Sequence, residues 1–100
     1  MRLTTAERQT IVAHVAAVFG AGAKPRLFGS RVDDSLRGGD IDLFVDGVAL
    51  TALQVRERRI DLLLRLHEVL GERKIDVVVQ RIDGPELPIH REARRNGVEL

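Results

Sequence analysis

Residues 27–45 read LFGSRVDDSLRGGDIDLFV, and they decide how the rest of the chain is interpreted. An apolar segment ends in Gly29-Ser30, a polar loop of nine residues follows, and a second apolar segment opens with Asp40-Ile41-Asp42. Apolar runs bounded by glycine and polar residues are typical of strands. The stretch therefore predicts two strands joined by a glycine-rich loop.

Composition bounds the class of protein before any motif is considered. The 100 residues are 44% hydrophobic, which is enough for one small domain over residues 1–100 and too little for two. A formal net charge of +1 and only three aromatic residues, all Phe, argue against nucleic-acid binding. The absence of cysteine excludes disulfide and thiolate metal sites and fits a reducing compartment. The N-terminal residues lack a signal peptide's apolar run, so we expect a cytoplasmic protein.

The segments before the decisive stretch predict a helix and the first strand. A capping box of Thr4 and Glu7 starts the helix, whose apolar periodicity stops at Gly20. The strand covers residues 23–28, and Pro25 predicts that it begins there or lies at a sheet edge.

After it, the pattern predicts a strand over residues 40–45, a turn at Asp46-Gly47, and a helix from about Leu50 or Thr51 to Leu70. This helix carries two apolar stripes: Leu53, Ile60, Leu63, Leu64 and Leu70; and Val55, Leu62, Leu66 and Val69. A surface helix needs one apolar face, so the other is covered by the C-terminal segment or by a partner. Arg56–Arg59 is interpreted as a solvated turn of the same helix.

The last third of the chain predicts a strand and a helix. Residues 74–79 are rich in β-branched side chains and predict a central strand interrupted by Asp76. A short amphipathic helix runs from Pro88 to about Arg95 and ends at Asn96-Gly97. The order helix, strand, strand, helix, strand, helix describes an α/β (α+β) fold, with a small sheet backed by helices.

Three carboxylates suggest a metal site on that sheet. Asp40 and Asp42 point to one face of their strand because side chains alternate. Asp76 lies between two core-facing residues and projects to the same side if its strand is a neighbour. Its burial in so apolar a strand would be costly without a metal or a partner. Oxygen ligands of this kind hold Mg²⁺ together with substrate phosphates, and three can hold two ions. Gly29 and Ser30 would offer backbone amides and a hydroxyl to phosphate oxygens, and Arg31 would add a charged contact.

Taken together, the Gly-Ser pair, the Asp-x-Asp pair and the later Asp76 resemble the DNA polymerase β-type nucleotidyltransferase superfamily. Within it, size and the phrases LFGSR and GDIDL are most similar to the minimal nucleotidyltransferase (MNT) proteins, over nearly the whole chain. The resemblance implies a polymerase β-like mixed sheet with its site on the open face. It also implies transfer of a nucleoside monophosphate from ATP or another NTP to a hydroxyl. Asp40 and Asp42 would bind two Mg²⁺ ions and Asp76 one of them, while Gly29, Ser30 and Arg31 would hold the triphosphate.

The resemblance further implies a partner. Minimal members are typically encoded beside a helical HEPN protein, often as the antitoxin of a toxin–antitoxin pair, and some are thought to add AMP to a partner tyrosine. A spare apolar stripe on the second helix and the basic Arg91, Arg94 and Arg95 would suit such a contact. The alternative is a catalytically silent antitoxin of the same fold that inhibits by binding alone. Transfer to a small molecule or to an RNA end is disfavoured by the missing acceptor domain and the low net charge.

Overall fold

The computed structural model describes residues 3–28, 41–71 and 73–100. Its elements, in chain order, are α1 (Thr5–Phe19), β1 (Lys24–Leu27), β2 (Ile41–Val48), α2 (Ala52–Leu70), β3 (Ile75–Arg81), α3 (Pro88–Asn96) and β4 (Val98–Glu99). The first six elements confirm the predicted order. The two-residue strand β4 was not predicted; it is too short to leave a periodic signal in the sequence.

The described strands form one mixed sheet in the order β3-β2-β1-β4. Strands β2 and β3 are parallel, joined by the α2 crossover, and β1 is antiparallel to both β2 and β4. The prediction that residues 74–79 form a central strand is wrong, because β3 lies at the edge of this sheet. The β-branched residues of β3 suit a strand that packs under helices on one face, and they do not require a neighbouring strand on each side. Of the two options predicted for Pro25, a strand start or a sheet edge, the structure has the first: Pro25 lies at the start of β1.

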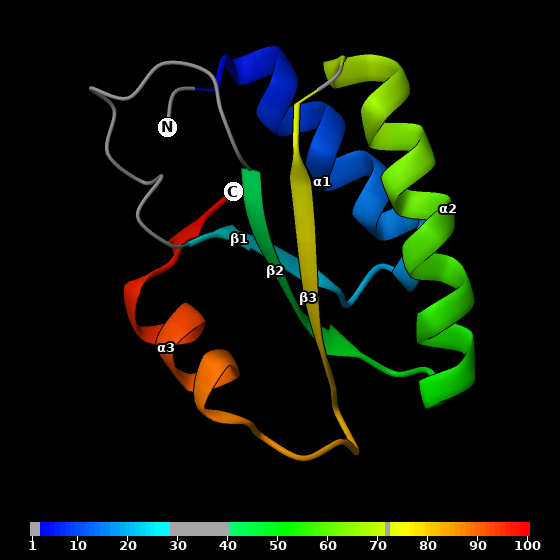
Figure 1. Ribbon diagram of the computed structural model, residues 1–100, viewed down its shortest axis with the longest axis vertical. Helices are drawn as coiled ribbons and strands as arrows, with labels where there is room; N and C mark the ends of the chain where they lie inside the picture. Colours follow the sequence, from blue (N-terminus) through cyan, green and yellow to red (C-terminus); the bar gives the residue numbers. More distant parts are fainter. Residues whose placement is uncertain (1–2, 29–40, 72) are drawn as a thin grey trace.

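Helices cover the two faces of the sheet unequally (Figure 1). Both α1 and α2 pack on one face, and the shorter α3 lies on the other. The main core fills the space under α1 and α2 with inward residues of β2 and β3 and one stripe of each helix. Its fully buried members are Ile11, Val15, Ile41, Leu43, Val45, Val48, Leu62 and Leu66. Among the described residues, no helix combines the length and apolarity needed to cross a membrane.

Burial on α2 does not follow the two predicted stripes, because Leu70 of the first is buried and Val69 of the second is 49% exposed. Leu62 and Leu66 are fully buried against α1 and the sheet, whereas Leu53, Ile60 and Leu64 are 61%, 57% and 67% exposed. The C-terminal segment lies across the opposite face of the sheet, so it does not cover these three exposed side chains. In the described part of the chain this outward stripe of Leu53, Ile60 and Leu64 therefore has no cover.

Residues 56–59 of α2 are all exposed, as predicted for a solvated turn, but two of the arginines also reach backbone oxygens of neighbouring elements. Arg58 donates to the carbonyl of Val18 at 3.0 Å, in the last turn of α1, where carbonyls lack a partner within the helix. Arg59 donates from Nε to the carbonyl of Val77 at 2.8 Å, on edge strand β3. Each long side chain therefore fastens α2 to a neighbouring element through a backbone oxygen.

Strand β2 runs three residues beyond its predicted end. It passes through Asp46 and Gly47 to Val48, and its register with β3 shifts between Val45 and Val48. Gly47 has φ +71°, and a Cβ atom there would lie 2.7 Å from the carbonyl oxygen of Gly22. The Asp-Gly pair that resembles a turn in the sequence is thus an irregularity inside a strand, as glycine permits.

Side-chain caps fix where the two long helices begin. Thr4 and Glu7 exchange hydrogen bonds of 2.9 and 3.0 Å at the start of α1, which confirms the predicted capping box. Thr51 and Gln54 form a second box at the start of α2, with bonds of 3.0 and 3.1 Å. Such boxes satisfy amides that the first helical turn leaves unpaired.

Candidate active site

Asp42 of β2 and Asp76 of β3 are direct partners in the parallel ladder between the two strands. Parallel neighbours lie about 4.8 Å apart, and residues in register point to the same face. Asp42 and Asp76 therefore stand side by side on the face of the sheet opposite α1 and α2. The prediction that Asp76 joins the Asp-x-Asp strand on one side is confirmed for Asp42.

Alternation along both strands produces this placement. Ile41 and Leu43, which flank Asp42, are fully buried, and Ile75 and Val77, which flank Asp76, are 6% and 3% exposed. The core side chains hold each strand's register, so the acidic residue between them must face the other way. Asp76 itself is exposed, so the expected cost of burying its carboxylate does not arise.

The other predicted site residues lie outside the described residues. These are Gly29, Ser30, Arg31 and Asp40. The last described residue before them is Phe28, whose amide donates to the carbonyl of Asp42 at 3.0 Å. The strand that leads to Gly29-Ser30 and the strand that follows Asp40 are therefore hydrogen-bonded to each other at Asp42.

Asp46 shares the face of Asp42, but it belongs to a different cluster. Its carboxylate accepts from Arg94 Nε of α3 at 3.3 Å and from the amide of Gly47 at 2.8 Å. Arg94 also donates to Glu86 and Gln80. The hydrogen bond to Asp46, with that to Glu86, raises the pKa of the Arg94 guanidinium above its ordinary value. Asp46 is thus an anchor for α3 and not a third ligand beside Asp42 and Asp76.

His90 has a structural role in the same cluster. It is 7% exposed, its Nδ1 accepts from the amide of Leu87 at 3.0 Å, and its ring lies 6.0 Å from that of Phe44. The guanidinium of Arg94 sits 5.8 Å from the Phe44 ring centre. Sequence reasoning missed this cluster. The available signal was the alternation of β2, which puts Phe44 on the face away from the main core.

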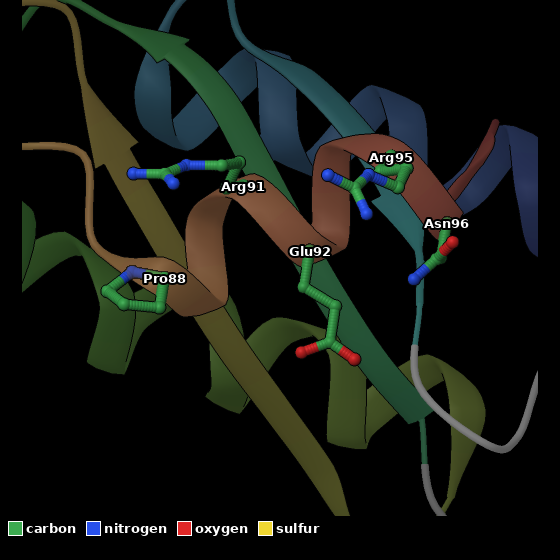
Figure 2. Close-up of a pocket in the computed structure, with 5 residues that line it drawn as sticks. All are labelled: Pro88, Arg91, Glu92, Arg95 and Asn96. Atoms are coloured by element: carbon green, nitrogen blue, oxygen red, sulfur yellow. The ribbon is translucent and has the colours of Figure 1, made fainter.

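A shallow hollow of about 310 Å³ lies on the outer side of α3. Figure 2 shows its described lining residues, which all come from that helix: Pro88, Arg91, Glu92, Arg95 and Asn96. Arg91 and Arg95 extend from one side of the helix and Glu92 from the other. Of the predicted basic segment, only Arg94 turns inward. The hollow does not contain the Asp42–Asp76 pair, and it lacks a carboxylate pair of its own, so the candidate active site remains on the sheet.

Within the described ranges, no group of three or more His, Cys, Asp or Glu residues is arranged to hold a metal ion. The predicted third carboxylate, Asp40, lies outside those ranges. Two carboxylates on neighbouring strands are therefore the part of the predicted metal site that the described geometry contains.

No protein-family model matches this chain, and no curated protein matches it either.

Proposed function

We propose that the chain is a metal-dependent nucleotidyltransferase of the minimal, polymerase β-like type. The observation that carries the proposal is the register of Asp42 with Asp76 on parallel strands, on the face opposite the main core. The mixed sheet, with α1 and α2 packed on the face opposite this pair, is compatible with the fold that the resemblance implies.

The donor set fits the proposed metal. Carboxylate oxygens are hard ligands, and Mg²⁺ is commonly held by one or two carboxylates together with substrate phosphates. Asp42 and Asp76 would be ligands, joined by Asp40, and Gly29, Ser30 and Arg31 would contact the triphosphate. When bound, the metal would neutralise phosphate charge and favour ionisation of the acceptor hydroxyl.

The chain's own contribution to this reaction is positioning. The acceptor oxygen forms a bond to the α-phosphorus, the bond between that phosphorus and the α–β bridging oxygen breaks, and pyrophosphate leaves with the electron pair. The hydroxyl proton passes to solvent. Ladder hydrogen bonds and the buried residues Ile41, Leu43 and Val77 hold both carboxylates on rigid strands, which lowers the entropic part of the barrier.

We place the acceptor hydroxyl on a partner protein, with ATP as donor and a HEPN-type toxin as the partner. Exposure of Asp76 on an edge strand supports this choice, because a hydroxyl carried by a folded protein can reach such a position. On this proposal the chain is an antitoxin that acts in the cytoplasm by adding AMP.

A transfer assay tests the proposal. The protein is incubated with α-labelled ATP and Mg²⁺, with and without the product of the neighbouring gene. Asp42→Asn and Asp76→Asn are compared with Asp61→Asn, which changes an exposed carboxylate on α2. Label on the partner that requires Asp42 and Asp76, but not Asp61, supports the proposal. A tight, silencing complex without label would instead establish an inhibitor that works by binding alone.

A further inference from the structure

We propose that Arg59 of α2 caps the long free edge of the sheet and keeps strand β3 from pairing with β3 of a second copy of this chain. The cap rests on the direction of the backbone groups of β3 and on the contact between Arg59 and the carbonyl of Val77. Because it concerns backbone groups at the sheet edge, it does not depend on the proposed activity of Asp42 and Asp76.

The two edges of the described sheet differ greatly in length. Strand β4 has two residues, so it offers little backbone to a further strand. Strand β3 has seven residues, IDVVVQR, and pairs with β2 along one side. It is rich in β-branched residues, which favour strand pairing. A long edge strand of this kind is a template for another chain unless something blocks it.

The ladder with β2 shows which backbone groups of β3 face outward. The amide of Ile41 donates to the carbonyl of Lys74 at 2.8 Å, so the Lys74 carbonyl points toward β2. Both backbone groups of a strand residue point to one side, and those of the next residue point to the other. The register continues unbroken to the pair of Val45 with Val79. The amides and carbonyls of Ile75, Val77 and Val79 therefore face away from β2, and a further strand would bond to them.

Arg59 occupies the middle of this outward row. Its Nε donates to the carbonyl of Val77, the central outward residue, at 2.8 Å. An added strand would need the same carbonyl, and its backbone would lie about 4.8 Å from β3, in the space that the Arg59 side chain fills. Pairing centred on Val77 would also bring the Arg59 cations of both copies together. Long cationic side chains on an edge strand's border disfavour such pairing for these reasons.

A second copy is the occupant that the edge would take without Arg59. In a solution that holds only this chain, the strand available for pairing is β3 of another copy, whose outward row is identical. Two such edges satisfy each other. Since the other edge of the described sheet is the two-residue β4, association would stop at a closed dimer and would not continue into a fibre.

Sedimentation equilibrium of the full chain tests the cap. Arg59→Met removes the donor and the charge but keeps a long side chain that favours a helix. Over about 10 µM to 1 mM, the wild type should stay monomeric and the weight-average mass of Arg59→Met should rise toward that of a dimer. Arg58→Met is the matched control and should stay monomeric. Arg58 also donates to a backbone carbonyl, but to that of Val18 at the end of α1 and not at a sheet edge.

Two further readouts separate edge pairing from a general loss of stability, and circular dichroism shows that the variants fold. Hydrogen exchange of the Val79 amide should slow in the Arg59→Met dimer, because this outward amide gains a partner. Arg59→Lys keeps a cationic donor and should stay monomeric.

Four results would each overturn the proposal. They are an Arg59→Met variant that stays monomeric, a wild type or an Arg58→Met variant that dimerises as readily, an Arg59→Lys variant that dimerises as Arg59→Met does, and a dimer whose Val79 amide exchanges as fast as in the wild-type monomer.

Discussion

Arg94 Nε and the carboxylate of Asp46 lie 3.3 Å apart, and this contact joins α3 to strand β2. The same arginine reaches Gln80 of β3, and its backbone carbonyl accepts from Arg26 of β1 at 3.2 Å. One residue of α3 thus touches three strands. Arg94 fixes α3 across the sheet, so the loss of its side chain should affect more than one ion pair.

Arg94→Met should destabilise the protein by about 1–2 kcal/mol, because Asp46 and Gln80 lose a charged partner; partial exposure of the pair limits the effect. Arg94→Lys should recover only part of this, since an ammonium cannot serve several acceptors in the guanidinium's fork geometry. Urea unfolding measures both values. Arg95→Met, an exposed neighbour in the same helix, is the control, and an equal loss there would contradict the assignment.

The pH dependence of this contribution follows from the raised pKa of Arg94. A cation whose pKa is raised on folding stabilises the native state below its unfolded pKa and loses that contribution as pH rises through the folded value. For arginine this window lies in strong alkali. The stability difference between wild type and Arg94→Met should therefore stay level from about pH 6 to 10. A difference that falls within that range would contradict the role of the guanidinium charge.

His90→Ala should weaken the start of α3. It removes the acceptor of the Leu87 amide and leaves space beside Phe44, at a cost of about 1–3 kcal/mol. His90→Gln should restore the cap, because glutamine at this helical position reaches back to the same amide. Hydrogen exchange of the Leu87 amide separates the two effects: it should speed up in the Ala variant and stay slow in the Gln variant.

Gly47→Ala should cost more stability than Gly20→Ala, although both glycines have positive φ. Backbone strain is common to both substitutions, but only at Gly47 would the new Cβ meet a backbone oxygen, that of Gly22 at 2.7 Å. Gly20 has nothing within 4 Å. We expect about 1 kcal/mol at Gly20 and clearly more at Gly47. Equal melting temperatures would show that the β2 irregularity relaxes freely.

Mn²⁺ or Mg²⁺ should raise the melting temperature of the wild type and not that of Asp76→Asn. A ligand at one hundred times its dissociation constant stabilises by about 2.7 kcal/mol. The control is Asp61→Asn, which removes an exposed carboxylate remote in sequence from Asp42 and Asp76. The metal should raise its melting temperature as much as that of the wild type. A metal-induced shift that persists in Asp76→Asn would place the binding site elsewhere.

Local signals in the sequence predicted the parts of the fold that depend on neighbouring residues. The Thr4–Glu7 box and the alternation around Asp42 and Asp76 act over three residues or fewer, and both are confirmed. What failed depends on contacts between distant segments. The edge position of β3 depends on which strands pair, and the role of Asp46 depends on Arg94 of α3, so no local pattern encodes either.

The candidate site was only partly predictable for the same reason. The pairing of Asp42 with Asp76 follows once β2 and β3 are neighbours, and a crossover helix makes that the simplest topology. The exposure of Asp76 does not follow, because a β-branched run looks the same in an edge strand and a central one. Gly29, Ser30, Arg31 and Asp40 remain predictions of the sequence.

The α2 crossover also sets when the carboxylate pair can exist during folding. Asp42 and Asp76 are 34 positions apart in the sequence, and they meet only after α2 has folded back and β3 has joined β2. Closing so long a segment carries an entropic cost that local helix formation does not. During synthesis, a nascent chain with α1, β1, β2 and α2 complete would still lack the pair. Any activity that needs both carboxylates is thereby withheld until the last third of the chain has emerged.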